Sequence, residues 1–174
     1  MRNPLVPSDF RVPQKAVIGN YRLEPLTATI NDEDHRVIIA NADAITRQRG
    51  GSRKDDEVYA NWPYSFSLED NYKDLAWLET CANWRMLFSY VMRHKVTGEY
   101  TGSVYLYPIE IIFPDLAARY DVDLSLWITQ SEYDAGLYDQ VFREILDWVV
   151  RGWPFDPARI HLGNAEIPDD LRQA

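Results

Sequence analysis

Cysteine and histidine are scarce in this sequence of 174 residues, which contains one cysteine and three histidines. A single cysteine, Cys81, cannot form a disulfide within the chain, so nothing points to an oxidising compartment. His35, His94 and His161 are scattered, and together with Cys81 they make none of the ligand spacings of a zinc site. The sequence therefore predicts no metal site, and we interpret Cys81 as a small buried hydrophobic residue.

Positive charge and long apolar runs are also lacking. Lys and Arg total 18 against 27 Asp and Glu, a formal net charge of −9, which argues against nucleic-acid binding. No apolar run approaches the length of a membrane-spanning helix. The first residues, MRNPLVPSDFRVP, contain charges and three prolines and lack the apolar core of a signal peptide. We therefore expect no membrane association and, by default, a cytoplasmic protein.

What the chain does contain suits one well-buried domain. Hydrophobic residues make up 46% of the sequence and aromatic residues 13%. The prolines near the start disfavour regular structure. We therefore predict an N-terminal arm at residues 1–19 and the domain at residues 20–174.

Hydrophobic periodicity predicts the order strand, helix, helix, hairpin, strand, helix, strand. Strands are expected at 21–30, at 84–92 and 100–107 in the hairpin, at 122–128 and at 159–162, and helices at 31–48, 67–82 and 131–152. This order is typical of an α/β fold with a mixed sheet.

The loop at 50–66 is rich in aromatic residues, namely Tyr59, Trp62, Tyr64 and Phe66. These residues either hold the loop in place by packing or form one wall of a pocket.

The stretch from 120 to 152 organises the rest of the chain. Its apolar residues at even positions from 122 to 128 alternate with Asp123, Ser125 and Trp127, so one strand face is apolar and the other mixed. Ser131 and Asp134 then form an S-x-x-D capping box, which predicts the start of a long helix. A strand that leads directly into a helix N-terminus is a ready anion site, because free backbone N–H groups and the helix dipole point at the turn.

Several segments carry a family resemblance: YRLEPLTA at 21–28, Trp62 in the loop, GEYTGSVYLYPI at 98–109 and DVDLSLWI at 121–128. Together, over about residues 21–167, they resemble the GNAT superfamily (GCN5-related N-acetyltransferases), and within it the branch that acetylates protein N-termini and small amines. The resemblance implies an acyl-CoA N-acyltransferase-like fold, with a central mixed sheet flanked by helices, and acetyl-CoA as the cofactor.

The resemblance also implies a site. Backbone N–H groups of Trp127, Ile128 and Thr129 would hold the pantetheine arm and polarise the thioester carbonyl. Asp123 would remove a proton from the amine substrate, which would be a small molecule or a protein N-terminus. The pyrophosphate would lie in the turn formed by Tyr133, Asp134, Ala135, Gly136 and Leu137.

This turn departs from the family pattern. The family usually has Arg/Gln-x-x-Gly-x-Gly/Ala, whereas residues 133–138 read YDAGLY, and only Gly136 matches. Asp134 lies where phosphate oxygens belong, which costs roughly 1 kcal/mol or more at a separation of ~4 Å. Tyr138 replaces a small residue. We therefore predict weak or no binding of acetyl-CoA. Because few residues follow position 162, we also expect the family's C-terminal strands to be missing.

Two functions are open at this point. The first is acyl-CoA-dependent transfer of an acetyl group to an amine with Asp123 as the base, although Asp123 could instead be a solvated or ion-paired carboxylate. The second is a catalytically inactive binding or assembly module. Ser131 is explained by its capping role. The sheet edge at 159–162 needs a cover, and we expect either the arm or a second subunit in a two-fold homodimer to supply it.

Overall fold

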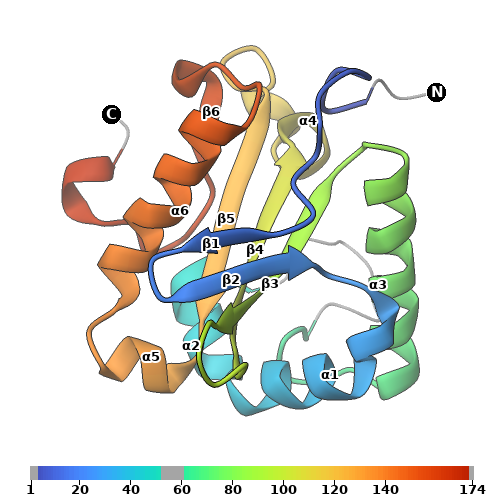
Figure 1. Cartoon of the computed structure of the whole chain (residues 1–174), viewed down its shortest axis with the longest axis vertical. Helices are drawn as coiled ribbons and strands as arrows, with labels where there is room; N and C mark the ends of the chain where they lie inside the picture. Colours follow the sequence, from blue (N-terminus) through green and yellow to red (C-terminus); the bar gives the residue numbers. More distant parts are fainter. Residues whose placement is uncertain (1–3, 52–60, 173–174) are drawn as a thin grey trace.

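A computed structural model describes residues 4–51 and 61–172 of the chain, and in them a six-stranded mixed sheet is flanked by helices. The strands follow one another in the sheet in their order along the chain, from β1 to β6. Figure 1 shows α6 on one side of this sheet and α1 and α3 on the other. The expected mixed α/β architecture is confirmed.

The sheet is antiparallel from β1 to β5 and parallel between β5 and β6. Its strands are β1 (Ala16–Ile18), β2 (Tyr21–Pro25), β3 (Phe88–His94), β4 (Tyr100–Pro108), β5 (Val122–Ile128) and β6 (Ile160–Leu162). The helices are α1 (Asn31–Ala40), α2 (Ala42–Arg49), α3 (Leu68–Asn83), α4 (Ile109–Ile112), α5 (Gln130–Asp134) and α6 (Tyr138–Gly152). Short 3-10 turns lie at Ala28–Ile30, Pro114–Leu116, Pro157–Arg159 and Asp169–Leu171.

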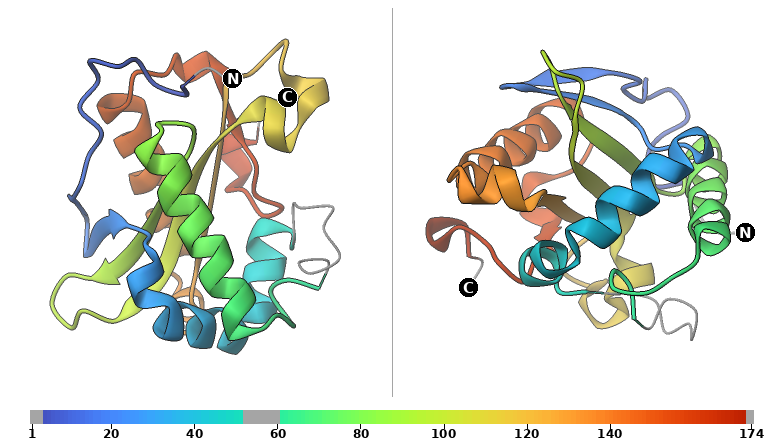
Figure 2. Two further views of the ribbon diagram at one scale, coloured as in Figure 1. Left: turned by 90° about the vertical axis from the view of Figure 1, so that its right-hand side faces the viewer. Right: turned by 90° about the horizontal axis from the view of Figure 1, so that it is seen from below.

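Strand β5 is buried on both faces. Leu124 and Leu126 point into the core shared with α6, whereas Trp127 belongs to the second core, under α1, α2 and α3. The indole Nε1–H of Trp127 donates to the Tyr105 hydroxyl of β4 across 3.0 Å, so its polar atom is satisfied inside that core. The face that the sequence indicated as mixed is therefore also an interior face. Helices α1, α2 and α3 cover this face and α6 covers the other, and Figure 2 shows the sheet between these two helical layers from two further directions.

The helix expected at 31–48 is two helices, because the chain bends at Asn41. The side-chain Nδ2 of Asn41 donates to the Val37 carbonyl at 2.8 Å, and the Oδ1 of Asn41 accepts the backbone N–H of Gln130 at 2.8 Å. An asparagine side chain that bonds the preceding turn competes with the helical ladder and favours a helix end. The same residue ties this end to the segment after β5.

The helix expected at 67–82 is confirmed as α3, and the Ser67 hydroxyl caps its start by accepting the N–H of Asp70 at 3.0 Å. The hairpin is confirmed as well, but its first strand starts later than expected. Trp84 ends α3 and is 67% exposed, and Arg85 has a φ of 62°. A left-handed residue cannot continue an extended strand, so β3 begins only at Phe88.

The single helix expected after β5 is also divided. Helix α5 ends at Asp134, Gly136 has a φ of 75°, and α6 starts at Tyr138. The capping box predicted at Ser131 is wrong, because α5 begins after Thr129 and no side chain caps it. A glycine in the left-handed region is the usual end of a helix, and here it separates the two.

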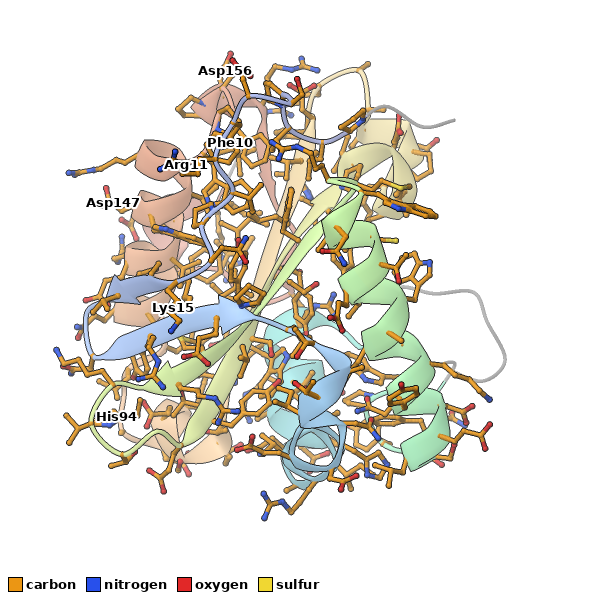
Figure 3. The ribbon with its side chains drawn as sticks, turned by 45° about the vertical axis from the view of Figure 1, so that its right-hand side comes forward. Phe10, Arg11, Lys15, His94, Asp147 and Asp156 are labelled. Atoms are coloured by element: carbon orange, nitrogen blue, oxygen red, sulfur yellow. The ribbon has the colours of Figure 1, made fainter. Side chains whose placement is uncertain are left out.

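The predicted arm contributes an edge strand. Ala16–Ile18 forms β1 beside β2, at the opposite end of the sheet order from β6. The expectation that the arm covers the β6 edge is therefore wrong. Earlier in the arm, Phe10 packs with its ring 5.5 Å from that of Trp153, and Figure 3 labels Phe10 where the arm runs near α6. Arg85 holds this stretch by donating to the Phe10 carbonyl at 2.7 Å and to the Pro7 carbonyl.

Candidate functional site

Strands β5 and β6 pair over only three positions. The last contact in this run is the N–H of Gly163, which donates to the Leu124 carbonyl at 2.9 Å. Further along, the N–H and C=O groups of Leu126 and Ile128 point toward the same side of β5. We call these four backbone groups the β5 edge. A buried edge must find other hydrogen-bond partners, because an unpaired backbone group away from water is costly.

Two side-chain amides bond the β5 edge. The amide of Asn164 accepts the N–H of Leu126 at 3.0 Å and donates to its carbonyl at 2.8 Å. The amide of Gln48 does the same at Ile128, at 2.8 and 3.0 Å. Both residues are buried. This amide pair, Gln48 and Asn164, takes the hydrogen bonds that a neighbouring strand would otherwise make.

The amide pair is itself held in place. Asn164 Nδ2 also donates to the backbone carbonyl of Gln48 at 3.0 Å and to the Tyr138 hydroxyl at 2.8 Å. That hydroxyl in turn donates to the Glu166 carbonyl at 2.7 Å, and the Glu166 N–H donates to the Gln48 carbonyl at 3.1 Å. Burial raises the pKa of Tyr138, which keeps its hydroxyl protonated and able to donate.

The turn predicted to hold pyrophosphate faces the same network. The Tyr133 hydroxyl donates to Glu166 Oε1 at 2.5 Å, and the Arg47 guanidinium lies 4.2 Å from the centre of the Tyr133 ring. Asp134 accepts a hydrogen bond from Gln130 within α5 at 2.6 Å. Of the remaining turn residues, Ala135 and Gly136 are exposed and Leu137 packs partly against the core.

The N–H groups expected to hold pantetheine are engaged within the chain. Ile128 donates to Gln48, and Thr129 donates to the Thr101 carbonyl at 2.8 Å. Trp127 lies opposite Ser103 in the β4–β5 register, on the side away from the β5 edge. A pantetheine arm could therefore pair with β5 only after the amide pair had left it.

Asp123 is buried, and its Oδ1 lies 2.7 Å from Nδ1 of His161 on β6. The imidazole ring packs between aromatic rings, 5.0 Å from Phe113 and 5.1 Å from Tyr120. Gly163 approaches so closely that a Cβ there would lie 2.1 Å from the carboxylate. Asp123 is thus an interior carboxylate with an imidazole partner, and no sequence pattern identifies His161 as that partner. Its role as a base stays a prediction.

A partly enclosed cavity of about 110 Å³ lies between the sheet and helices α1 and α3. Trp62 lines it, so this loop residue does form a pocket wall, whereas Tyr59 lies outside the described residues. Arg49 also lines it and is buried. Its guanidinium lies 4.1 Å from the ring centre of Tyr105 and 5.3 Å from that of Trp62, and its Nε donates to Ser125 Oγ at 3.2 Å. Stacked aromatic rings stabilise a buried guanidinium.

A second charged side chain, Asp34, lines the same cavity. Tyr100 donates to its Oδ1 at 2.6 Å, and Asn71 donates to its Oδ2 at 2.9 Å. Burial raises the pKa of Asp34, although these two hydrogen bonds oppose the shift.

Among the residues that the structure describes, no group of three or more His, Cys, Asp or Glu side chains could hold a metal ion. The described helices include none long and apolar enough to cross a bilayer.

Neither protein-family models nor curated proteins match this chain. Several solved structures do match it. Ribosomal-protein-S5-alanine acetyltransferase from Vibrio fischeri superposes with a TM-score of 0.55 at 13% identity, covering 79% of this chain and 67% of its own. RimL, a ribosomal L7/L12 alpha-N-protein acetyltransferase in complex with coenzyme A, gives 0.54 at 14% identity, covering 79% and 69%. The chain has the GNAT fold. Mycobacterium smegmatis RimJ, in complex with a CoA disulfide, gives 0.54 at 12% identity, covering 76% and 57%.

The GNAT fold gives the β5 edge its significance. In this superfamily, as the sequence resemblance implies, the pantetheine arm inserts beside the strand that corresponds to β5. In this chain the amide pair already bonds that edge. The residues present do not fit a pantetheine arm there. The only sequence signal for this amide pair is the presence of Gln48 and Asn164. Gln48 lies 80 positions from Ile128 and Asn164 lies 38 positions from Leu126, so no local pattern shows that the two amides bond β5.

Proposed function

We propose that this GNAT-fold chain is a binding protein that does not transfer acetyl groups from acetyl-CoA. The observation that carries the proposal is the amide pair at the β5 edge. Both amides are buried and each makes two hydrogen bonds to β5. Displacing them would orphan buried polar groups, each of which costs about 1–3 kcal/mol. The turn at 133–138 supports the proposal, because Tyr133 and Tyr138 bond Glu166 there.

Calorimetric titration with acetyl-CoA tests this. For the wild-type chain we expect no saturable binding, which means a dissociation constant above about 1 mM. A value in the low micromolar range would overturn the proposal. The double variant Gln48→Ala, Asn164→Ala identifies the cause: tighter binding than wild type would show that the amide pair is what excludes the cofactor. Gln140→Ala, at an exposed glutamine of α6, is the matched control and should bind as the wild type does.

A second candidate is N-acetyl transfer from acetyl-CoA to an amine, either a small molecule or a protein N-terminus. The Asp123–His161 pair favours it, because a buried carboxylate that orients an imidazole is an arrangement used for general-base catalysis. The ribosomal-protein acetyltransferases that share this fold give further support. Release of free thiol from acetyl-CoA, in the presence of a primary amine or a peptide with an N-terminal alanine, tests this candidate. Turnover that Asp123→Asn abolishes would favour it over the binding protein, and no release above background would reject it.

A further inference from the structure

Strand β1 forms an open edge of the sheet, at the end opposite to β6. Among residues 4–51 and 61–172, no strand pairs with its outer side. Ile18 pairs with Tyr21 across the two-residue turn at 19–20, so these two residues exchange their backbone hydrogen bonds. Bonding alternates along an antiparallel pair, so the N–H and C=O of Val17 point away from β2. We call these two groups the β1 edge.

A groove of about 410 Å³ lies beside the β1 edge, between β1 and α6, and Figure 1 shows β1 next to this helix. Ala16 and Ile18 belong to the core shared with α6, whereas Val17 is 71% exposed. Residues directly opposite each other in a sheet share a face. On a strand added to β1, the residues on either side of the one that bonds Val17 would therefore face the groove. Extended peptides bind sheet edges in this way, with backbone bonds for affinity and alternate side chains for specificity.

One carboxylate in the groove lacks a cation. Of the charged residues that line it, Asp147 and Arg151 pair with each other at 2.7 Å, which leaves Glu144. Glu144 Oε1 accepts the Gln140 amide at 2.9 Å, whereas its Oε2 is buried and has no hydrogen-bond partner in the described part of the chain. Buried polar atoms normally have a partner.

The charges around the groove do not remove this deficit. Lys95 donates to a backbone carbonyl of the β1–β2 turn at 2.9 Å, and Lys15, labelled in Figure 3, precedes β1. Both lysines are exposed, and neither forms an ion pair with Glu144. Glu132 accepts a hydrogen bond from the Tyr21 hydroxyl, and burial together with the carboxylates of Glu132 and Glu144 raises the pKa of Tyr21. A cationic side chain would thus supply the partner that Glu144 lacks.

We propose that the β1 edge binds an extended segment of a partner protein, which adds a strand beside Val17 and places a lysine or arginine side chain in the groove. The methylene groups of that side chain would lie along Trp148, with the charge beside Glu144. A second copy of this chain is a poorer occupant, because its own strand offers only Ala16 and Ile18 at the positions that face the groove, and neither is charged. The proposal rests on the proposed function, to which it gives a partner class, but it uses no residue of the amide pair.

The test is an NMR titration of the full chain with a capped pentapeptide, Thr-Val-Lys-Val-Thr, and with analogues that carry norleucine or glutamate in place of lysine. The lysine peptide should bind about threefold or more tightly than the norleucine peptide, and the glutamate peptide should bind most weakly. N-methylation of both valine amides should abolish binding, because these N–H groups face β1, whereas N-methylation of the lysine amide should not. Equal binding of the lysine and norleucine peptides, or tolerance of the methylated valines, would overturn the proposal.

Two variants locate the site. Val17→Pro removes the outward N–H without touching the bonds to β2 and should abolish binding, whereas Val17→Thr keeps this N–H and should bind as the wild type does. Glu144→Gln should remove the preference for lysine over norleucine, and Glu110→Gln, at an exposed site on α4, is its matched control. Unchanged binding by Val17→Pro would show that the peptide lies elsewhere. A dimer that Val17→Pro dissociates in light scattering would show that a second copy occupies the edge, which overturns the proposal. Peptide binding by a chain that also binds acetyl-CoA would refute only the proposed function.

Discussion

Replacing Gln48 by methionine tests the energetic weight of the amide pair. Methionine is similar in size to glutamine, so the main change is the loss of two hydrogen bonds to Ile128, at 2.8 and 3.0 Å. The N–H and C=O of Ile128 would then stay buried without partners, at about 1–3 kcal/mol each. Because some water can enter, we expect the free energy of unfolding to fall by about 2–4 kcal/mol in total.

Urea denaturation followed by circular dichroism measures this change, and the m-value checks that the unfolding transition is comparable. Gln140→Met is the control, since Gln140 lies exposed on α6, and it should change stability by no more than about 0.5 kcal/mol. If Gln48→Met proved as stable as that control, the β5 edge would not depend on the amide pair. The argument against a pantetheine arm would then lose its energetic basis.

Three further predictions concern other parts of the chain. Arg93 lowers the pKa of Glu33 through hydrogen bonds of 2.6 and 3.0 Å, so the stabilisation is complete above the unfolded pKa of ~4.3 and is lost as the pH falls through the folded value. Glu33→Gln should therefore lower the free energy of unfolding by at most about 1 kcal/mol at pH 7 and by less at pH 3. An equal loss of stability at both pH values in denaturation experiments would contradict this. Asp123→Ala should lower the unfolding free energy by about 1.5–3 kcal/mol, because His161 loses its carboxylate partner; urea melts that coincide with wild type would argue that the pair is energetically neutral. The edge at β6 is expected to pair with a second copy in a two-fold dimer, and light scattering that gives the mass of one chain at high concentration would remove that expectation.

Local sequence signals predicted much of the fold. Alternation along 122–128 located β5, and hydrophobic periodicity located α3 and the hairpin of β3 and β4. The S-x-x-D signal at Ser131 failed, because a short α5 and a left-handed Gly136 replace a continuous helix. Local patterns report which structure a segment prefers, and tertiary contacts such as the Asn41–Gln130 bond decide where it bends.

The candidate site was harder to predict. The family resemblance pointed to β5, and the residues at 133–138 gave reason to doubt cofactor binding. The partners of β5 could not be read from the pattern, because Gln48 is a buried polar residue in a helix and Asn164 follows a short strand. Each reads as an ordinary surface residue in isolation. The cavity under α3 combines residues from α1, α2, α3 and β4, and only the packed structure brings them together.

The amide pair also has a consequence for how the chain opens. Gln48 belongs to α2, and Asn164 lies beyond β6, yet both bond β5 and are joined to each other through the Gln48 carbonyl. The amide protons of Leu126 and Ile128 can exchange with solvent only when these side chains leave the strand. Slow exchange at these two positions would therefore report a single opening event shared by α2, β5 and the segment around Asn164. Segments separated by 116 positions in sequence would thus behave as one cooperative unit.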